Sequence, residues 1–138
     1  MPHPSKRILC VEDETETCEL LTNLFKPVGY DVITAPSFIA AWGKVINEKF
    51  DLYLLDHWLP GGSGLELCQR IRAVDLHTPV VFFTGAAYET ERQAALAAGA
   101  QAYLVKPRDI AQLVATVERL LLNGQGGGQR KGARKLSQ

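Results

Sequence analysis

The chain has 138 residues, of which 46% are hydrophobic and 22% are charged. This length and composition are typical of a single globular domain and exclude a disordered chain or a pair of full-sized domains. No hydrophobic stretch approaches the roughly 20 residues that a membrane-spanning helix needs, and no secretory signal precedes the first strand-like segment. The three cysteines are odd in number and lack metal-ligand spacing, so we expect free thiols in a cytoplasmic protein.

The formal net charge is zero, but the charges are unevenly distributed. Residues 123–138 contain four basic residues and no acidic one, which leaves 11 basic and 15 acidic residues, a net charge of −4, for residues 1–122. Because binding to nucleic-acid phosphates needs a basic surface, direct nucleic-acid binding is not expected of this part. The basic, Gly-rich segment is predicted to be a flexible tail or linker, so the chain divides into a domain at 1–122 and a tail at 123–138.

Short hydrophobic segments alternate with amphipathic helical segments along the domain. The hydrophobic segments are continuous rather than alternating, as is typical of parallel strands that are covered on both faces. The five strand candidates are Ile8–Val11, Tyr30–Thr34, Leu52–Leu55, Val80–Phe83 and Ala102–Val105. Ser63 and Glu66 have the spacing of a capping box, and Gly99 is a natural helix stop. Five strand-helix units predict a three-layer, doubly wound (βα)5 fold of the α/β class, with a five-stranded parallel sheet in the order 2-1-3-4-5.

Polar residues follow four of the five predicted strands. Glu12 and Asp13 follow the first strand, Asp56 the third, Thr84 the fourth and Lys106 the fifth. In doubly wound sheets, ligands bind at the carboxyl edge, where the strand order reverses. Because strands one and three are neighbours in the predicted order, Glu12, Asp13 and Asp56 should converge, with Thr84 and Lys106 on the far side.

This combination of side chains indicates a site for a metal ion and a phosphoryl group. Three carboxylates that lie close together repel one another and raise one another's pKa values unless a cation is present. Mg²⁺ suits such a cluster, because it is a hard ion that prefers oxygen ligands and shares them with substrate phosphates. A lysine and a hydroxyl opposite can bind the remaining phosphoryl oxygens. Each residue alone fits a helix cap, a strand end or a solvated surface, but such roles do not explain all five together.

Four motifs occur in order at the predicted strand ends. They are Ile8–Glu14, Leu54–Asp56 continuing through Leu59–Gly61 into Gly64–Leu67, Val81–Gly85, and Gly99–Pro107. The residues Asp13, Asp56, Thr84 and Lys106 within them are separated by 43, 28 and 22 positions. With these motifs and spacings, the chain from about Lys6 to Leu122 resembles the response-regulator receiver domain of two-component signalling, which has the CheY-like form of the flavodoxin-like fold.

The resemblance implies that Asp56 accepts a phosphoryl group from a phosphohistidine on a sensor histidine kinase or phosphotransfer protein. The implied Mg²⁺ ligands are Glu12, Asp13, Asp56 and the backbone carbonyl of Trp58. Thr84 and Lys106 would bind phosphoryl oxygens, and Thr84 and Tyr103 would form a switch. A cis peptide is implied at Lys106-Pro107, where the proline makes the cis form accessible.

The implied protein is a signalling domain rather than an enzyme, although it assists its own phosphorylation and dephosphorylation. Its other partners would be a downstream protein target or an output domain, and a second copy of the chain. A linker that starts near Gly124 fits either a stand-alone regulator or the N-terminal part of a longer protein.

Two alternatives remain open at this stage. A phosphoaspartyl hydrolase of the haloacid-dehalogenase kind needs a second acid two residues after the nucleophile, and Trp58 stands at that position. A pseudo-receiver that only binds partners typically lacks the acceptor, the acids or the lysine. Two neighbours of the acidic residues are not assigned to the site. His57 has no second histidine at ligand spacing and is expected to be exposed or half-packed, and Glu14 is expected to belong to the first helix.

Overall fold

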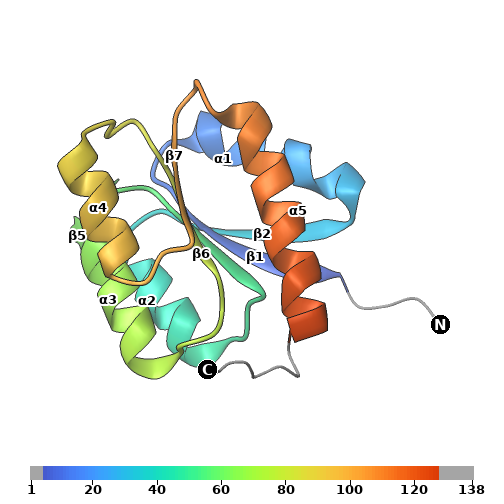
Figure 1. Cartoon of the computed structure of the whole chain (residues 1–138), viewed down its shortest axis with the longest axis horizontal. Coiled ribbons are helices and arrows are strands. Elements are labelled where there is room, and N and C mark those ends of the chain that lie inside the picture. The colour runs from blue at the N-terminus through green and yellow to red at the C-terminus, as the bar shows by residue number, and fades with distance from the viewer. Residues whose placement is uncertain (1–4, 128–138) are drawn as a thin grey trace.

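The computed structural model describes residues 5–127, in which strands and helices alternate along the chain (Figure 1). The strands are β1 (Lys6–Val11), β2 (Tyr30–Ala35), β3 (Leu52–Leu55), β4 (Trp58–Leu59), β5 (Gly62–Ser63), β6 (Val80–Thr84) and β7 (Ala102–Val105). The helices are α1 (Thr15–Phe25), α2 (Phe38–Asn47), α3 (Gly64–Val74), α4 (Glu89–Ala97) and α5 (Ile110–Gly127), with a 3-10 turn η1 (Lys26–Val28) after α1. All five predicted strands are present, although β1 begins earlier than its hydrophobic segment.

Five of the strands form one parallel sheet in the order β2-β1-β3-β6-β7. Numbered by themselves in chain order, these strands have the predicted order 2-1-3-4-5, so the doubly wound α/β fold is confirmed. The order reverses at β1 and β3, which are direct neighbours and pair Val11 with Leu55 at their carboxyl ends. A reversal of this kind opens a crevice outside the strand ends. The residues that follow Val11 and Leu55 therefore meet at one edge of the sheet.

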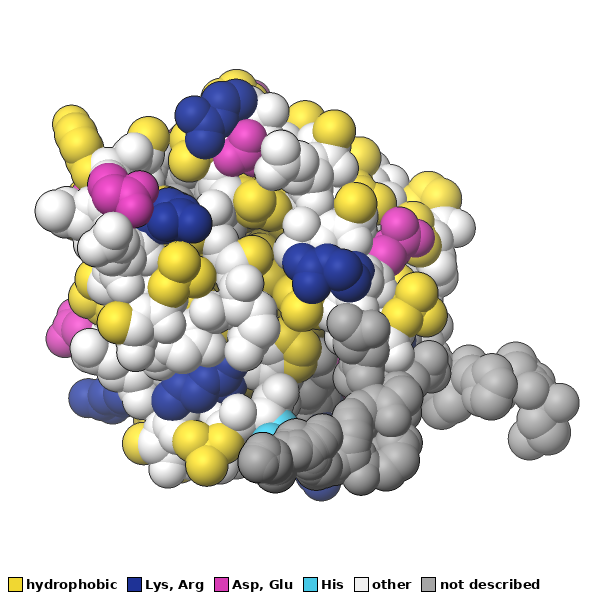
Figure 2. All heavy atoms as spheres, viewed as in Figure 1, with side chains coloured by type: hydrophobic (Ala, Val, Ile, Leu, Met, Phe, Trp, Pro, Cys, Tyr) yellow, Lys and Arg dark blue, Asp and Glu magenta, His cyan; other side chains and the backbone are white. Residues whose placement is uncertain are grey.

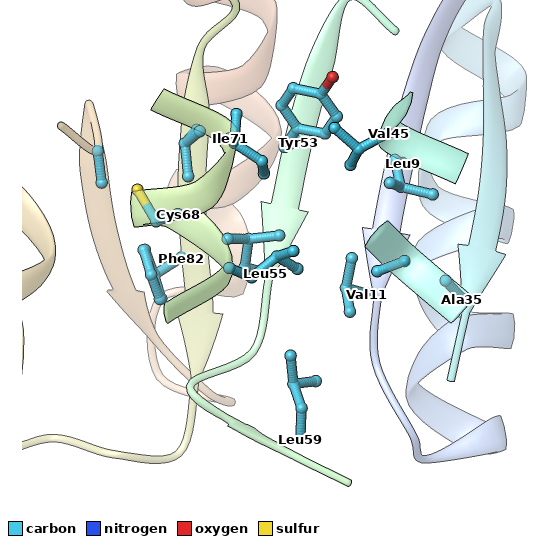
Figure 3. Close-up of a cluster of buried hydrophobic side chains, with 14 of the residues drawn as sticks. Leu9, Val11, Ala35, Val45, Tyr53, Leu55, Leu59, Cys68, Ile71 and Phe82 are labelled. Atoms are coloured by element: carbon cyan, nitrogen blue, oxygen red, sulfur yellow. The ribbon is translucent and has the colours of Figure 1, made fainter. Parts of the chain in front are cut away.

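Helices cover both faces of the sheet and enclose two hydrophobic cores (Figure 1). Because successive strand residues point to opposite faces, each strand contributes to both cores. The core beneath α2, α3 and α4 is shown in Figure 3, where Leu55 of β3 lies between Val11 of β1 and Phe82 of β6. The second core, beneath α1 and α5, contains Cys10 and Leu54. Full burial of a leucine or phenylalanine side chain contributes about 1.5–3 kcal/mol, so these cores hold the strand ends in place.

The loop after β3 contains a short antiparallel hairpin that the sequence did not predict. Its strands β4 and β5 pair across a turn formed by Pro60 and Gly61, and Gly61 has a φ of 84° that suits glycine. The carbonyl of Pro60 accepts a hydrogen bond from the backbone N–H of Phe38 at the start of α2 (3.1 Å). The segment that follows Asp56 is therefore attached to α2.

Three local predictions are confirmed. The hydroxyl of Ser63 accepts a hydrogen bond from the Glu66 N–H, and the Glu66 carboxylate accepts one from the Ser63 N–H, which completes the capping box of α3. Gly99 follows the end of α4 with a left-handed φ of 109°. The peptide bond between Lys106 and Pro107 is cis.

Helix α5 extends further than the predicted domain. It runs to Gly127, so residues 123–127 of the predicted tail are helical, and residues 128–138 lie outside the described part of the chain. The division at residue 122 stays a prediction. Within residues 5–127, each helix is too short or too polar to cross a lipid bilayer.

Candidate functional site

The backbone fixes the two acidic segments at the carboxyl edge of the sheet. Glu12 follows β1, and its N–H donates to the carbonyl of Ala35 on β2 (3.0 Å). Asp56 follows β3, and its N–H donates to the carbonyl of Val11 (3.1 Å). The sheet ladder thus continues one residue beyond each strand, so the first residue of each acidic segment is held as firmly as a strand residue.

Three carboxylates converge at this edge. Glu12, Asp13 and Asp56 each place one carboxylate oxygen within 4.8 Å of the others. The side chains of Glu12 and Asp56 are buried, whereas Asp13 is exposed. Buried carboxylates need compensating charge or hydrogen bonds, and two buried acids side by side make that requirement stronger.

Lys106 supplies a positive charge directly to the two buried acids. Its ammonium Nζ donates to Glu12 Oε1 at 2.9 Å and to Asp56 Oδ2 at 3.3 Å. Lys106 follows β7 on the far side of the acidic cluster, as predicted, but its side chain reaches back to the two buried acids. The backbone N–H of Lys106 donates to the Thr84 carbonyl (2.8 Å) and continues the pairing of β7 with β6. From there the long side chain reaches across β3 to β1.

The pKa values follow from this arrangement. Burial raises the pKa of Glu12, and the hydrogen bond from Lys106 opposes that rise. Burial also disfavours the charged form of Lys106, but the hydrogen bond to Glu12 and the charge of Asp56 raise the pKa of its ammonium above the usual value. Lys106 therefore stays charged near neutral pH. One ammonium faces three carboxylates, which leaves the cluster with an excess of negative charge.

The donor set suits Mg²⁺. Carboxylate oxygens are hard ligands, and Mg²⁺ usually takes one or two of them together with water and phosphate oxygens. The exposed Asp13 leaves the cluster open to solvent, which such a hydrated ion requires. The predicted contribution of the Trp58 backbone carbonyl stays a prediction, as do the roles of the three carboxylates as metal ligands.

Thr84 is the last residue of β6, and Tyr103 lies on the neighbouring strand β7. Thr84 is fully buried, and its hydroxyl oxygen accepts a hydrogen bond from the N–H of Ala86 (3.2 Å). Tyr103 is 7% exposed, stacks on Phe82 at 5.5 Å and donates its hydroxyl proton to the carbonyl of Ala86 (2.6 Å). The two proposed switch residues are thus linked through Ala86. Tyr103 already occupies an inward position in this structure.

His57 is buried, so the prediction of an exposed or half-packed side chain is wrong. Its imidazole is 6% exposed and lies between the rings of Trp58 (4.6 Å) and Phe82 (6.3 Å). Its Nδ1 has no hydrogen-bond partner among the described residues. Aromatic rings therefore pack on the imidazole, while the backbone N–H of His57 donates to Asp56 Oδ1 (2.7 Å).

Glu14 contacts the site from a position just before α1, so the prediction that it belongs to the first helix is wrong. It precedes α1 in an extended conformation, and its carboxylate lies 3.6 Å from the ammonium of Lys106. Its position directly after Asp13 was visible in the sequence. The contact with Lys106 could not be predicted, because it forms only when the lysine side chain extends across the sheet in the folded chain.

Comparison with known proteins agrees with the fold. The family model for the response regulator receiver domain matches residues 8–118. The chain belongs to this family. The receiver domain is 36% identical over 117 residues to the alkaline phosphatase synthesis transcriptional regulatory protein PhoP of Bacillus subtilis, an alignment that covers 85% of this chain and 49% of that protein. The chain spans about half the length of the curated relatives it matches.

Solved structures of receiver domains superimpose closely on this one. The crystal structure of a response regulator receiver domain protein (CheY-like) from Methanospirillum hungatei superimposes on this chain with a TM-score of 0.83 and 30% sequence identity. The alignment covers 88% of this chain and 98% of that protein chain. The response regulator TrrA of Thermotoga maritima, solved in complex with Mg²⁺-BeF, superimposes with a TM-score of 0.75 and 34% sequence identity. That alignment covers 83% of this chain and 98% of the TrrA chain. The receiver domain described here therefore shares its fold with proteins of the same family.

The buried tyrosines predict a loss of stability at alkaline pH. Burial raises the pKa values of Tyr53 and Tyr103 to about 12 each, and nearby acids add to the rise. An unfolded chain releases these protons near pH 10, roughly, whereas the folded receiver domain keeps them until about pH 12. The free energy of unfolding should therefore be unaffected by these groups below pH 10 and fall by roughly 1–2 kcal/mol per tyrosine as the pH rises towards 12.

Urea unfolding at pH 9 and pH 11 measures this fall. Tyr103→Phe lacks the hydrogen bond to Ala86 and should be less stable at pH 9, but its free energy of unfolding should fall less steeply between the two pH values. An equal fall in both proteins would show that Tyr103 does not contribute.

Proposed function

We propose that Asp56 accepts a phosphoryl group from a phosphohistidine on a sensor histidine kinase or a phosphotransfer protein. A carboxylate oxygen of Asp56 attacks phosphorus. The new O–P bond forms while the P–N bond to the donor histidine breaks, and that nitrogen keeps the electron pair. The observation that supports this proposal most strongly is the position of the Asp56 carboxylate, 3.3 Å from Lys106 and grouped with the carboxylates of Glu12 and Asp13.

The neighbouring residues have separate roles in this proposal. Lys106 and the Thr84 hydroxyl bind phosphoryl oxygens and stabilise the charge that spreads over them during transfer. Mg²⁺ would be held by the carboxylates of Glu12, Asp13 and Asp56 and by the backbone carbonyl of Trp58. When bound, the ion would neutralise part of the phosphoryl charge. The backbone N–H of His57 donates to Asp56 Oδ1 at 2.7 Å. This bond orients the carboxylate, so that its other oxygen faces Lys106.

Intact-mass spectrometry with acetyl phosphate and Mg²⁺ tests the proposal. The chain should gain the mass of one phosphoryl group, and chelation of Mg²⁺ by EDTA should prevent the gain. A chain that gains no mass in the presence of Mg²⁺ would instead support the pseudo-receiver alternative, in which the domain only binds partners.

Mg²⁺ should bind without phosphate, and Asp13→Ala should weaken that binding by roughly tenfold or more. Asp13 is exposed but contributes an oxygen to the cluster, and loss of even an outer partner of a metal site typically costs about 10–100-fold in affinity. A titration followed by tryptophan fluorescence measures the affinity. Asp31→Ala, an exposed acid on β2, is the control and should bind Mg²⁺ like the wild type. Equal affinities in all three proteins would contradict the site.

Phosphorylation would act on the partner-binding surface through Thr84 and Tyr103. A phosphoryl group adds roughly −1.5 to −2 charges and draws the Thr84 hydroxyl towards it. Because Tyr103 is already buried, we propose that phosphorylation stabilises this inward packing within a population that also includes other arrangements. Changed hydrogen-exchange protection around Tyr103 after phosphorylation would support this switch.

The surface that would respond comprises α4, β7 and α5. A hollow of about 830 Å³ on this surface is lined by three basic residues, Arg92, Arg108 and Arg119, and by one acid, Asp109. Figure 2 shows the face that carries α4 and α5, where basic and acidic side chains lie among hydrophobic and uncharged ones. A downstream protein, an output domain or a second copy of the chain would bind here. Arg92 already pairs with Glu89, and Arg108 with Asp109, so a partner surface that carries charges of both signs suits this hollow.

Trp58 should slow the loss of the phosphoryl group. Its indole is 60% exposed and packs on the His57 ring, in the segment that directly follows Asp56. Hydrolysis needs a water molecule in line with the acyl oxygen, and a bulky ring on that approach excludes water. Trp58→Asn, which can orient water, should lose phosphate roughly fivefold faster, equivalent to about 1 kcal/mol in the barrier.

The decay of the phosphorylated protein in excess Mg²⁺ measures this effect. Trp58→Ala should be intermediate, because it removes the bulk without adding a group that orients water. Trp42→Phe, on the partly buried second tryptophan of α2, should decay like the wild type. Equal decay in all four proteins would mean that Trp58 packs outward and has no effect on hydrolysis.

A further inference from the structure

Glu14 lies beside the acidic cluster without belonging to it. Its Oε1 is 3.6 Å from the Lys106 ammonium, while its side chain is 66% exposed. The hydroxyl of Thr17, one turn into α1, donates to the same Oε1 at 3.2 Å. The backbone N–H of Glu14 donates to Glu12 Oε2 at 3.1 Å, which anchors the residue at the rim of the site. These contacts direct the Glu14 carboxylate towards Lys106.

Lys106 forms ion pairs with three carboxylates of the described chain, at 2.9 Å to Glu12, 3.3 Å to Asp56 and 3.6 Å to Glu14. Glu12 and Asp56 also belong to the set of oxygens that could hold a metal ion, and Glu14 does not. A divalent cation on Glu12 and Asp56 would compete for the oxygens that bind the ammonium and would repel its charge. If the cation displaces Lys106 from Glu12 and Asp56, Glu14 is still free to pair with the Lys106 ammonium.

We propose that Glu14 is a positioning residue for Lys106. It holds the ammonium at the edge of the site when Mg²⁺ takes the carboxylates of Glu12 and Asp56, and it thereby makes metal binding more favourable. The inference rests on the proposed function, because it requires Mg²⁺ at this cluster. In the metal-free protein Lys106 has two closer partners, and an exposed ion pair contributes little, so loss of Glu14 should leave metal-free stability unchanged.

Mg²⁺ titrations of the full chain, followed by tryptophan fluorescence, test the proposal. Glu14→Gln should weaken Mg²⁺ binding by roughly threefold to fivefold, the range expected for a partly exposed ion pair. Glu16→Gln is the matched control, because Glu16 is an exposed acid in the first turn of the same helix. It should change the affinity by less than about twofold, because Glu16 has no ion pair with Lys106 in the described part of the chain and salt largely screens exposed charges that lie more than roughly 8–10 Å apart.

A double-mutant cycle with Lys106→Met separates positioning of the lysine from direct attraction of the metal. If Glu14 acts through Lys106, Glu14→Gln should have no effect on Mg²⁺ affinity in the Lys106→Met protein. An equal weakening in both backgrounds would overturn the proposal, because it would show that Glu14 attracts Mg²⁺ by its own charge. Thermal unfolding without Mg²⁺ checks that each variant is folded.

The outcomes distinguish this inference from the function on which it rests. Wild-type protein that binds Mg²⁺ with the same affinity as Glu14→Gln overturns the positioning role alone. Wild-type protein that does not bind Mg²⁺ overturns the proposed metal site and this inference with it.

Discussion

Replacing Asp56 by Asn should abolish phosphorylation of the receiver domain by acetyl phosphate and Mg²⁺. An ionised carboxylate oxygen can attack phosphorus, whereas the amide of asparagine is a far weaker nucleophile. Asparagine has nearly the same shape, and its carbonyl oxygen can accept the hydrogen bond from the His57 N–H that Asp56 Oδ1 accepts at 2.7 Å. The variant should therefore fold, and its mass should not increase.

Two further measurements make this result specific. Asp31→Asn changes an exposed aspartate on β2 in the same way and should gain one phosphoryl group, like the wild type. Peptide mapping of the wild type should place the added mass on the peptide that contains Asp56. A gain of mass by Asp56→Asn, or a mapped peptide without Asp56, would show that another group is the acceptor.

The central strands β3 and β6 could be predicted from the sequence because they are buried on both faces. A parallel strand such as β3 is hydrophobic at every position, and that signal needs no tertiary information. β1 was predicted to start at Ile8, but Lys6 and Arg7 extend it by pairing with β2. Arg7 remains on the strand because its side chain reaches Glu48 at 2.8 Å, 41 residues along the chain. Such a contact leaves no trace in the local pattern.

The convergence of the acidic residues could also be predicted, because it depends only on strand order and strand ends. The direct contacts of the Lys106 ammonium could not, since a lysine side chain can point to either side of a strand end. Its attraction to Glu12 and Asp56 decides between these directions, and this attraction exists only in the folded chain. The burial of His57 has a similar origin, because Phe82 of the neighbouring strand provides one of the surfaces that enclose it.

The β4–β5 hairpin had a sequence signal that periodicity does not capture. Pro60 and Gly61 form a turn dipeptide, but strands of two residues are too short for a hydrophobic pattern. The hairpin matters for function because it determines where Trp58 lies. Its attachment to α2 through Pro60 gives the proposed shielding of the phosphoryl group a fixed framework rather than a flexible loop.

Gly64→Ala should destabilise the receiver domain by about 3 kcal/mol or more, which corresponds to a fall in melting temperature of roughly 10 °C. A Cβ atom on Gly64 would clash with the backbone carbonyl oxygen of Asp56 and would lie 2.9 Å from Cε2 of Phe82. The first contact is with backbone that the sheet holds in place, so a side-chain rotation cannot relieve it. Gly64 also donates its N–H to the His57 carbonyl (2.8 Å), which fixes the start of α3 against this segment.

Gly43→Ala makes the same chemical change at a position without such contacts and should have the opposite effect. Gly43 lies inside α2, where a new Cβ would meet no atom within 4 Å, and alanine in a helix is favoured over glycine by roughly 0.5–1 kcal/mol. Thermal and urea unfolding of the two variants measure the contrast. Because the clash at Gly64 displaces the residue that carries the proposed acceptor, Gly64→Ala should also be phosphorylated more slowly, whereas Gly43→Ala should react at the wild-type rate. Equal stability of Gly64→Ala and wild type would show that α3 can move away from Asp56, and the site would then be less rigid than its backbone contacts indicate.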